Sequence, residues 1–299
     1  MMAARGGFLL DRWSLFLVAT ITTSAAVILT ANSRDLSSAA DISSMIQFSV
    51  RASVPWLYLA FAASSLAAIF PSKVSRWLLR NRRYIGLCFA VGMVWQLVFI
   101  LWFVAVHWDY YLENAYAFVD IAVQIPGYVI LTLMTVTSFR PGRDKLSARQ
   151  WRILHKTGIY FLWATVYSTY WNELYYYDDI QRIDHFYYWT GFVAMGARIL
   201  AWSLKRWQDC AAGGVARIRL PLLLAGAAVA IVGLLGIAFT PWWSPAVIET
   251  VWSLGYVAPT VDLAIPFLPI LVLGLGAWLV VRSRATTPTT AVSASGPGA

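Results

Sequence analysis

Long apolar segments recur along the whole chain and constrain its fold more than any other feature. A helix that crosses the hydrocarbon core of a bilayer needs about 20 mostly apolar residues. Inside that core the backbone polar groups must be satisfied within the chain, which favours helices over open sheets. We therefore predict an all-α fold, a polytopic transmembrane helical bundle of about eight spans near residues 13–32, 54–71, 84–106, 117–138, 157–172, 186–204, 219–239 and 261–281.

The composition agrees with this class. Hydrophobic residues make up 60% of the 299 residues and charged residues only 12%. Soluble domains average about 25% charged residues, so the chain lies well outside their range. We expect an integral membrane protein whose first partner is the lipid bilayer.

Basic residues are concentrated in alternate connections between the predicted spans. The connections after the second, fourth and sixth spans hold the Lys and Arg clusters 73–83, 140–156 and 205–219, whereas the connections between them carry mostly acids. Cytoplasmic loops are enriched in Lys and Arg, so the clusters are predicted to face the cytoplasm and to place both termini there, in a multi-pass protein of the cell (inner) membrane. The net charge of +9 then reflects topology. No nucleic-acid partner is expected, because no basic helix or patch with interleaved aromatic residues lies outside these loops.

Two stretches resemble a known family. RNRRYIGLCFAVGMVWQLVFI runs from Arg80 through the third predicted span, and TVTSFRPGRDKLSARQWRILHKTGIYFLWATVYSTYW leads into the fifth. Both are similar to the ferric-reductase-like transmembrane family, which includes the haem-binding membrane subunit of the periplasmic methionine sulfoxide reductase. The features that carry the resemblance are Arg82, Arg83, Gly86, Thr137, Ser138, Trp151, Leu154, His155 and Tyr160.

The resemblance covers about residues 50–205. It implies a bundle that holds b-type haem between histidines on different helices and transfers electrons, for which the axial ligands are imidazoles. His155 matches the inner-end histidine of the family and is the one cofactor-binding residue that the resemblance implies, with haem b as the cofactor. The family's other histidine positions are occupied here by Met93 or Gln96 and by Ser168. The alternative for His155 is a polar residue at the boundary of the membrane.

Gln96 and Ser168 are expected to lie at the same depth. Gln96 follows Arg83 by as many residues as Ser168 follows His155, which corresponds to about 20 Å of helix in each case. If the two helices face one another, an amide and a hydroxyl stand where the family has haem ligands, and such groups can hydrogen-bond between membrane helices. This pair is either a reshaped site or an ordinary polar contact between helices.

Two classes of function remain open. In the first, the protein is a membrane oxidoreductase component that receives electrons from a separate flavoprotein or quinone. In the second, it is a haem-free structural or partner-binding membrane protein. One inner-end histidine cannot supply the ligand pairs of a two-haem relay, so membership of the family with a degenerate haem site is favoured. No catalytic residue and no metal site are assigned.

The predicted spans and the resemblance divide the chain into four segments. Residues 1–49 carry the first span, residues 50–205 form the ferric-reductase-like core, and residues 206–282 add two further spans. Residues 283–299 are rich in small residues and proline, so we predict a disordered cytoplasmic tail.

Overall fold

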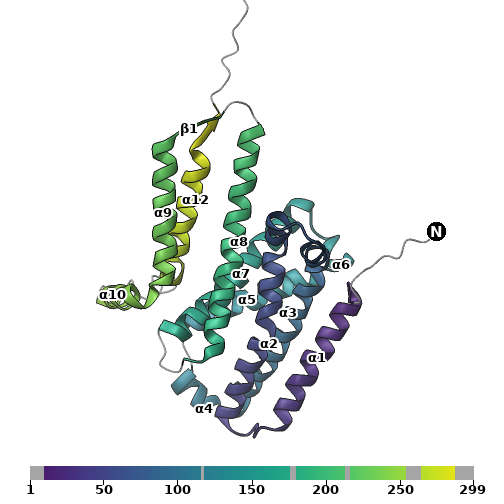
Figure 1. Ribbon diagram of the computed structural model, residues 1–299. Coiled ribbons are helices and arrows are strands. Elements are labelled where there is room, and N and C mark those ends of the chain that lie inside the picture. The colour runs from purple at the N-terminus through teal and green to yellow at the C-terminus, as the bar shows by residue number, and fades with distance from the viewer. Residues whose placement is uncertain (1–9, 116–117, 176–179, 213–215, 254–263, 287–299) are drawn as a thin grey trace, which may run out of the picture. The chain divides into compact units, whose positions relative to one another are not determined.

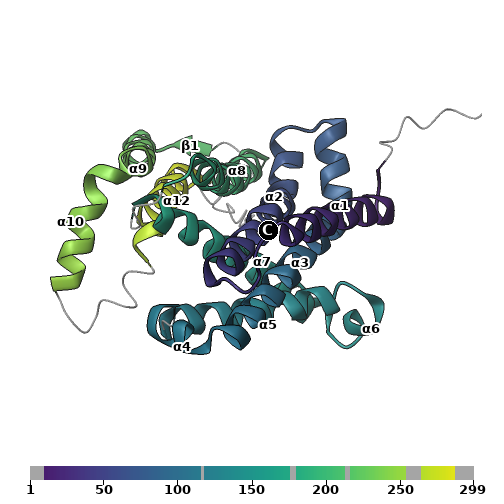
Figure 2. The same ribbon diagram turned by 90° about the horizontal axis from the view of Figure 1, so that it is seen from below.

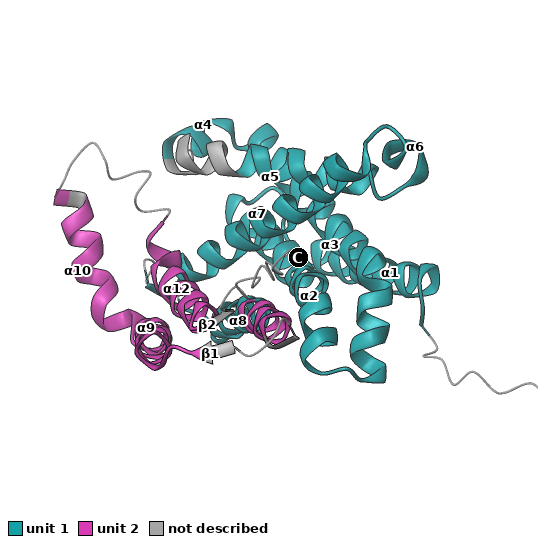
Figure 3. Cartoon of the chain, turned by 90° about the horizontal axis from the view of Figure 1, so that it is seen from above, with its two compact units in different colours: residues 1–198 teal, residues 199–299 magenta. Residues whose placement is uncertain are grey.

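The computed structural model describes residues 10–115, 118–175, 180–212, 216–253 and 264–286 (Figure 1). Helices make up the described part of the chain apart from two three-residue strands, which confirms the predicted all-helical class. The chain divides into two compact units, Met1–Arg198 and Ile199–Ala299 (Figure 3). The division falls within one helix, Arg182–Ala212.

Unit 1 consists of helices. Its elements are α1 (Trp13–Asn32), α2 (Ala39–Ile69), α3 (Lys73–Val106), α4 (Trp108–Tyr110), η1 (Tyr111–Ala115), α5 (Phe118–Val136), α6 (Arg140–Arg143), α7 (Ala148–Tyr175) and the first part of α8 (Arg182–Ala212). The largest contact is between α2 and α3, followed by the contacts of α1 with α3 and of α5 with α7 (Figures 1 and 2).

Five segments in the described part of the chain are long and apolar enough to cross a membrane. They are α1, α2, α3, α9 (Leu220–Ala238) and Ile265–Arg282. The other predicted spans correspond to α5, α7 and α8. Only Gln124–Val136 of α5 counts as an apolar helix, and α7 begins with the basic residues of the preceding connection. The membrane-helix prediction therefore holds, but the number of eight spans is not confirmed.

The core of unit 1 joins its first three helices. One cluster of buried side chains comprises Leu15, Ala60, Ala63, Leu78 and Ile85, and a second comprises Val27, Ile42, Met45, Phe99 and Phe103. Each cluster takes residues from α1, α2 and α3. Helix α1 therefore packs as part of unit 1.

Hydrogen bonds fix where α1 and α3 begin. Ser72 and Ser75 form a capping box at the start of α3, with reciprocal backbone-to-hydroxyl bonds of 2.9 and 3.1 Å, which starts the helix well before the predicted residue 84. The buried amide of Asn81 accepts a hydrogen bond from the Arg12 backbone at 2.6 Å and donates one to the Asp11 carboxylate at 2.6 Å. The start of α1 is thereby tied to α3.

Unit 2 is built on a helix pair, α9 and α12 (Leu268–Arg282). Strand β1 (Ala216–Ile218) precedes α9, strand β2 (Arg284–Thr286) follows α12, and the two strands pair antiparallel. Glycines allow the helices to touch, because a Cβ at Gly233 would lie 2.5 Å from the Leu273 backbone nitrogen and one at Gly276 would overlap the Ala230 backbone.

Two further details of unit 2 differ from the prediction. Helix α10 (Thr240–Ser253) follows α9 where no helix was expected, and the one-turn helix η3 (Ile265–Phe267) leads into α12. Residues 284–286 pair with β1, so the first part of the predicted disordered tail is ordered by the strand pairing. Residues 287–299 of that tail lie outside the described residues.

Candidate functional site

His155 lies in the second turn of α7 and is bonded to the end of α5. Its Nε2 atom lies 3.0 Å from the Thr137 hydroxyl oxygen, and that oxygen also lies 2.6 Å from the carbonyl oxygen of Leu133. A hydroxyl has one proton, and the shorter contact to a pure acceptor takes it. Thr137 therefore accepts from His155, which assigns the imidazole proton to Nε2.

Trp151 covers one face of the His155 ring. The two ring centroids are 4.4 Å apart with an angle of 30° between the ring planes. The indole Nε1 donates to the Thr137 backbone carbonyl at 3.1 Å, and the guanidinium of Arg143 lies 5.1 Å from the centre of the Trp151 ring. The imidazole is therefore held from two sides, by Thr137 at its edge and by Trp151 at its face.

The surroundings of His155 favour its neutral form. Burial lowers its pKa most, and the positive charges of Arg82 and Arg143 lower it further, from 6.5 to about 4. The imidazole is therefore uncharged at neutral pH. This agrees with its use as a hydrogen-bonding group between helices.

Further arginines lie near His155 in unit 1. Arg198 of α8 donates to the Phe61 carbonyl at 2.6 Å and to the Tyr160 hydroxyl at 3.1 Å, and its guanidinium lies 4.3 Å from the centre of the Phe61 ring. Arg82 is half-buried, and its charge acts on both Arg198 and His155. Among the described residues Arg82 forms neither a hydrogen bond nor an ion pair, whereas its neighbour Arg80 is paired with Asp11 at 3.5 Å.

Gln96 and Ser168 are each hydrogen-bonded elsewhere. The Gln96 side-chain oxygen accepts a hydrogen bond from the Tyr128 hydroxyl of α5 at 2.8 Å. The Ser168 hydroxyl donates to the Thr165 carbonyl of its own helix at 2.9 Å. Helix α7 packs mainly against α5 and α2, and α3 is not among its principal neighbours. Gln96 therefore makes a polar contact with another helix, but its partner is Tyr128 of α5 and not Ser168.

A column of stacked aromatic rings runs through the interior of unit 1. Phe61 stacks on Trp163 with centroids 5.5 Å apart, Trp163 on Tyr167 at 5.0 Å, and Tyr167 on Tyr188 at 5.3 Å. The Trp163 indole donates to the Gly191 carbonyl at 3.0 Å. Because these rings are buried, they form part of the core, and they join α2, α7 and α8.

A buried ion pair lies beside this column and is not evident from the sequence pattern. Arg51 donates to the fully buried carboxylate of Asp184 at 3.0 Å and to the Gln181 side chain at 2.8 Å. Tyr187 donates its hydroxyl proton to the Arg51 carbonyl at 2.7 Å. The two charges are far apart in the chain, and no sequence motif connects them.

The residues present do not fit a haem between two histidines. The chain has three histidines, and the Nε2 atom of His155 is already bonded to Thr137. Gln96 and Ser168 have other partners and are not imidazoles. Among the described residues no group of three or more His, Cys, Asp or Glu side chains is placed to hold a metal ion. The ligand role of His155 stays a prediction, and its contacts favour a structural role.

Comparisons with known proteins identify no relative of the chain. No protein-family model, no curated protein and no solved structure matches the chain. The interpretation of the site therefore rests on the geometry of its own residues.

Proposed function

We propose that the protein is a haem-free helical membrane protein that acts as a structural or partner-binding component of the bilayer. The two sequence stretches that resemble the ferric-reductase-like family support the proposal that it is a member of that family with a degenerate haem site. The observation that carries this proposal is the bond between His155 and Thr137. This bond engages the Nε2 atom of the one histidine that matches a histidine of the family.

The replaced ligand positions support the same conclusion. Gln96 bonds to Tyr128, so the position has become a link between α3 and α5. Ser168 bonds to its own helix, as serine commonly does within helices. Neither side chain supplies an imidazole to iron, and a single ligand from His155 leaves haem without its second axial histidine.

The absorption spectrum of the purified protein tests this proposal. Protein from haem-replete cells should lack the Soret and alpha bands of a bis-histidine haem in the oxidised and in the dithionite-reduced state. A matched sample of the His155→Ala variant should have the same spectrum. Bands in the wild-type protein that disappear in the variant would contradict the proposal.

A second candidate is an electron-transfer subunit that uses one haem at His155 and an electron donor such as a flavoprotein or quinone. The observation in its favour is the aromatic column of Phe61, Trp163, Tyr167 and Tyr188, since stacked rings are suitable carriers of single electrons. The same spectra separate the two candidates, because this one requires haem bands that depend on His155.

A further inference from the structure

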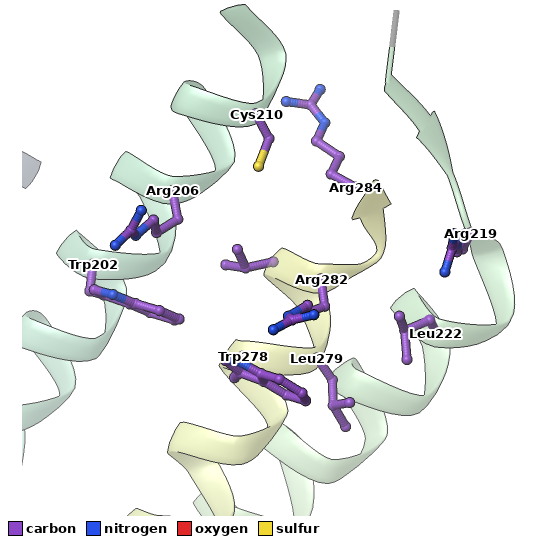
Figure 4. Close-up of a pocket in the computed structure, with 10 residues that line it drawn as sticks. Trp202, Arg206, Cys210, Arg219, Leu222, Trp278, Leu279, Arg282 and Arg284 are labelled. Carbon is purple, nitrogen blue, oxygen red and sulfur yellow. The ribbon is translucent and has the colours of Figure 1, made fainter. Parts of the chain in front are cut away.

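Unit 2 contains a pocket of about 780 Å³ between the end of α8, the start of α9 and the end of α12 (Figure 4). Four arginines line it: Arg206, Arg219, Arg282 and Arg284. All of the lining residues are described, and none of them is an aspartate or a glutamate. The pocket is therefore strongly cationic, with no internal counter-charge on its walls.

Arg284 is held in place but retains an unused donor. Its Nη1 donates to the Trp207 carbonyl at 3.0 Å, and its guanidinium lies 4.2 Å from the centre of the Trp207 ring. Its Nε atom is buried and finds no acceptor among the described residues. A buried charged donor without an acceptor is costly, so an anion close to the Arg284 guanidinium would offset part of this cost.

The opposite end of the pocket is apolar. Figure 4 shows Trp202 and Trp278 at one end and Cys210 and Arg284 at the other, with Arg206 and Arg282 between them. The guanidinium of Arg282 lies 4.8 Å from the centre of the Trp278 ring. The pocket thus changes from aromatic to cationic along its length.

The position of the pocket in the chain explains this polarity. It lies where α9 begins and α12 ends, and α9 and Ile265–Arg282 are both long and apolar enough to cross a membrane. Tryptophan is enriched at the boundary between hydrocarbon and water, and arginine at the cytoplasmic boundary. The pocket therefore belongs to the level of the lipid headgroups.

We propose that this pocket binds the phosphate group of an anionic lipid. Guanidinium groups bind phosphate through paired, charge-assisted hydrogen bonds, and basic pockets between membrane helices bind acidic headgroups. In this proposal the guanidinium groups of Arg206, Arg282 and Arg284 bind the phosphate, and the acyl chains leave the pocket past Trp202 and Trp278. A free phosphate ion would use only the arginine end, so the apolar end favours a lipid. The inference is independent of whether the protein binds haem.

A labelling experiment on Cys210 tests the source of the phosphate. The full chain carrying Cys88→Ala is purified, delipidated in detergent and titrated with short-chain phosphatidylglycerol, phosphatidylcholine or inorganic phosphate. Cys210 lines the pocket, so bound lipid should slow its reaction with a maleimide. We expect protection by phosphatidylglycerol at concentrations about tenfold lower than by the zwitterionic lipid. Equal protection by both lipids, or by inorganic phosphate at the same concentration, would overturn the proposal.

A pair of matched variants tests the arginines. Arg206→Gln with Arg282→Gln removes two exposed pocket charges, whereas Arg149→Gln with Arg152→Gln removes two exposed charges of α7 outside the pocket. The pocket variant should bind phosphatidylglycerol about tenfold more weakly by native mass spectrometry, and the α7 variant should bind as the wild type does. Equal losses would show a general charge effect and overturn the proposal. Arg282→Gln alone, expected to weaken binding in the same direction, is the second variant if the double variant fails to fold.

Discussion

The Nε2 atom of His155 lies 3.0 Å from the hydroxyl oxygen of Thr137, and this bond joins the start of α7 to the end of α5. The Thr137 proton is used by the Leu133 carbonyl at 2.6 Å, so the imidazole is the donor. A histidine that is a donor at Nε2, neutral and covered by Trp151 serves as a link between two helices. This structural role of His155 requires no bound metal.

Acidification should weaken the protein through His155. Its pKa in the folded protein is lowered to about 4, against an ordinary value of 6.5, so the unfolded chain binds the proton first as the pH falls. The stability that the neutral imidazole contributes is complete above 6.5 and is lost as the pH falls toward 4. Thermal unfolding in detergent should therefore show a larger loss over this range for the wild type than for His155→Gln. Equal losses would contradict the prediction.

Removing the acceptor of His155 should also destabilise the protein. Thr137→Val leaves the imidazole N–H without its partner in a half-buried position, which costs about 1–3 kcal/mol in the free energy of unfolding. Thr132→Val is the matched control, because Thr132 is exposed on the same helix. A control that costs as much as Thr137→Val would show that the hydroxyl at position 137 has no special role.

Gln96 and Tyr128 should be energetically coupled. Gln96→Leu and Tyr128→Phe each remove one side of the 2.8 Å bond between α3 and α5. Hydrogen bonds between membrane helices contribute about 0.5–2 kcal/mol, so the double variant should be less destabilised than the sum of the two single variants by that amount. Unfolding in a denaturing detergent gives the three free energies. Additive costs would mean that the bond contributes nothing.

The apolar helices could be predicted from the sequence, and the partner of each polar residue could not. Helix α1 begins and ends where its apolar run does. Helix α3 begins much earlier than its apolar run, because the capping box of Ser72 and Ser75 lies outside that run. The depth of Gln96 follows from helical rise, but its partner depends on which helices are neighbours, and α5 rather than α7 lies beside it.

The sequence predicts some of the residues in the site at the start of α7, but not their contacts. His155 was singled out because the stretch around it resembles a family, and Thr137 and Trp151 belong to the same resemblance. Their mutual contacts depend on the turn through α6, which brings the end of α5 back to the start of α7. The ion pair between Arg51 and Asp184 could not be found in this way, because 133 residues separate its members and neither lies in a motif.

The contact between α9 and α12 should depend on one glycine more than on its neighbour. A Cβ at Gly276 would overlap the backbone of Ala230, whereas one at Gly274 meets nothing within 4 Å. Gly276→Ala should therefore cost about 1–3 kcal/mol of stability through overpacking. Gly274→Ala should be neutral or slightly stabilising, since alanine is the better helix former. The opposite order of the two unfolding midpoints would contradict the packing of unit 2.

Labelling from outside the cell tests the proposed orientation. In a chain with Cys88→Ala and Cys210→Ser, a thiol at Ala40 should react with an impermeant maleimide, and one at Lys145 should react only after the cells are opened. Both positions are exposed. The expectation follows from the basic connection around Lys145, which the positive-inside rule places in the cytoplasm. The reverse pattern would invert the topology.

The ion pair of Arg51 and Asp184 should contribute more stability than the exposed pair of Arg34 and Asp41 at the start of α2. Asp184 is fully buried and its carboxylate accepts from Arg51 at 3.0 Å and from the Gln181 backbone at 3.1 Å. Arg51→Gln leaves a buried carboxylate without its cation, which costs about 3–5 kcal/mol. Arg34→Gln breaks the exposed pair with Asp41, 3.2 Å long, and should cost at most about 1 kcal/mol.

A second substitution separates the charge from the loss of a side chain. In Arg51→Gln with Asp184→Asn the buried position is neutral, so part of the stability lost in Arg51→Gln should return. Asparagine retains an oxygen that can accept the hydrogen bond from the Gln181 backbone, which keeps the start of α8 in place. The melting temperatures of the wild type, Arg51→Gln, Arg34→Gln and the double variant, measured in one detergent, test this prediction. If the double variant is no more stable than Arg51→Gln, the uncompensated carboxylate is not the cause of the loss.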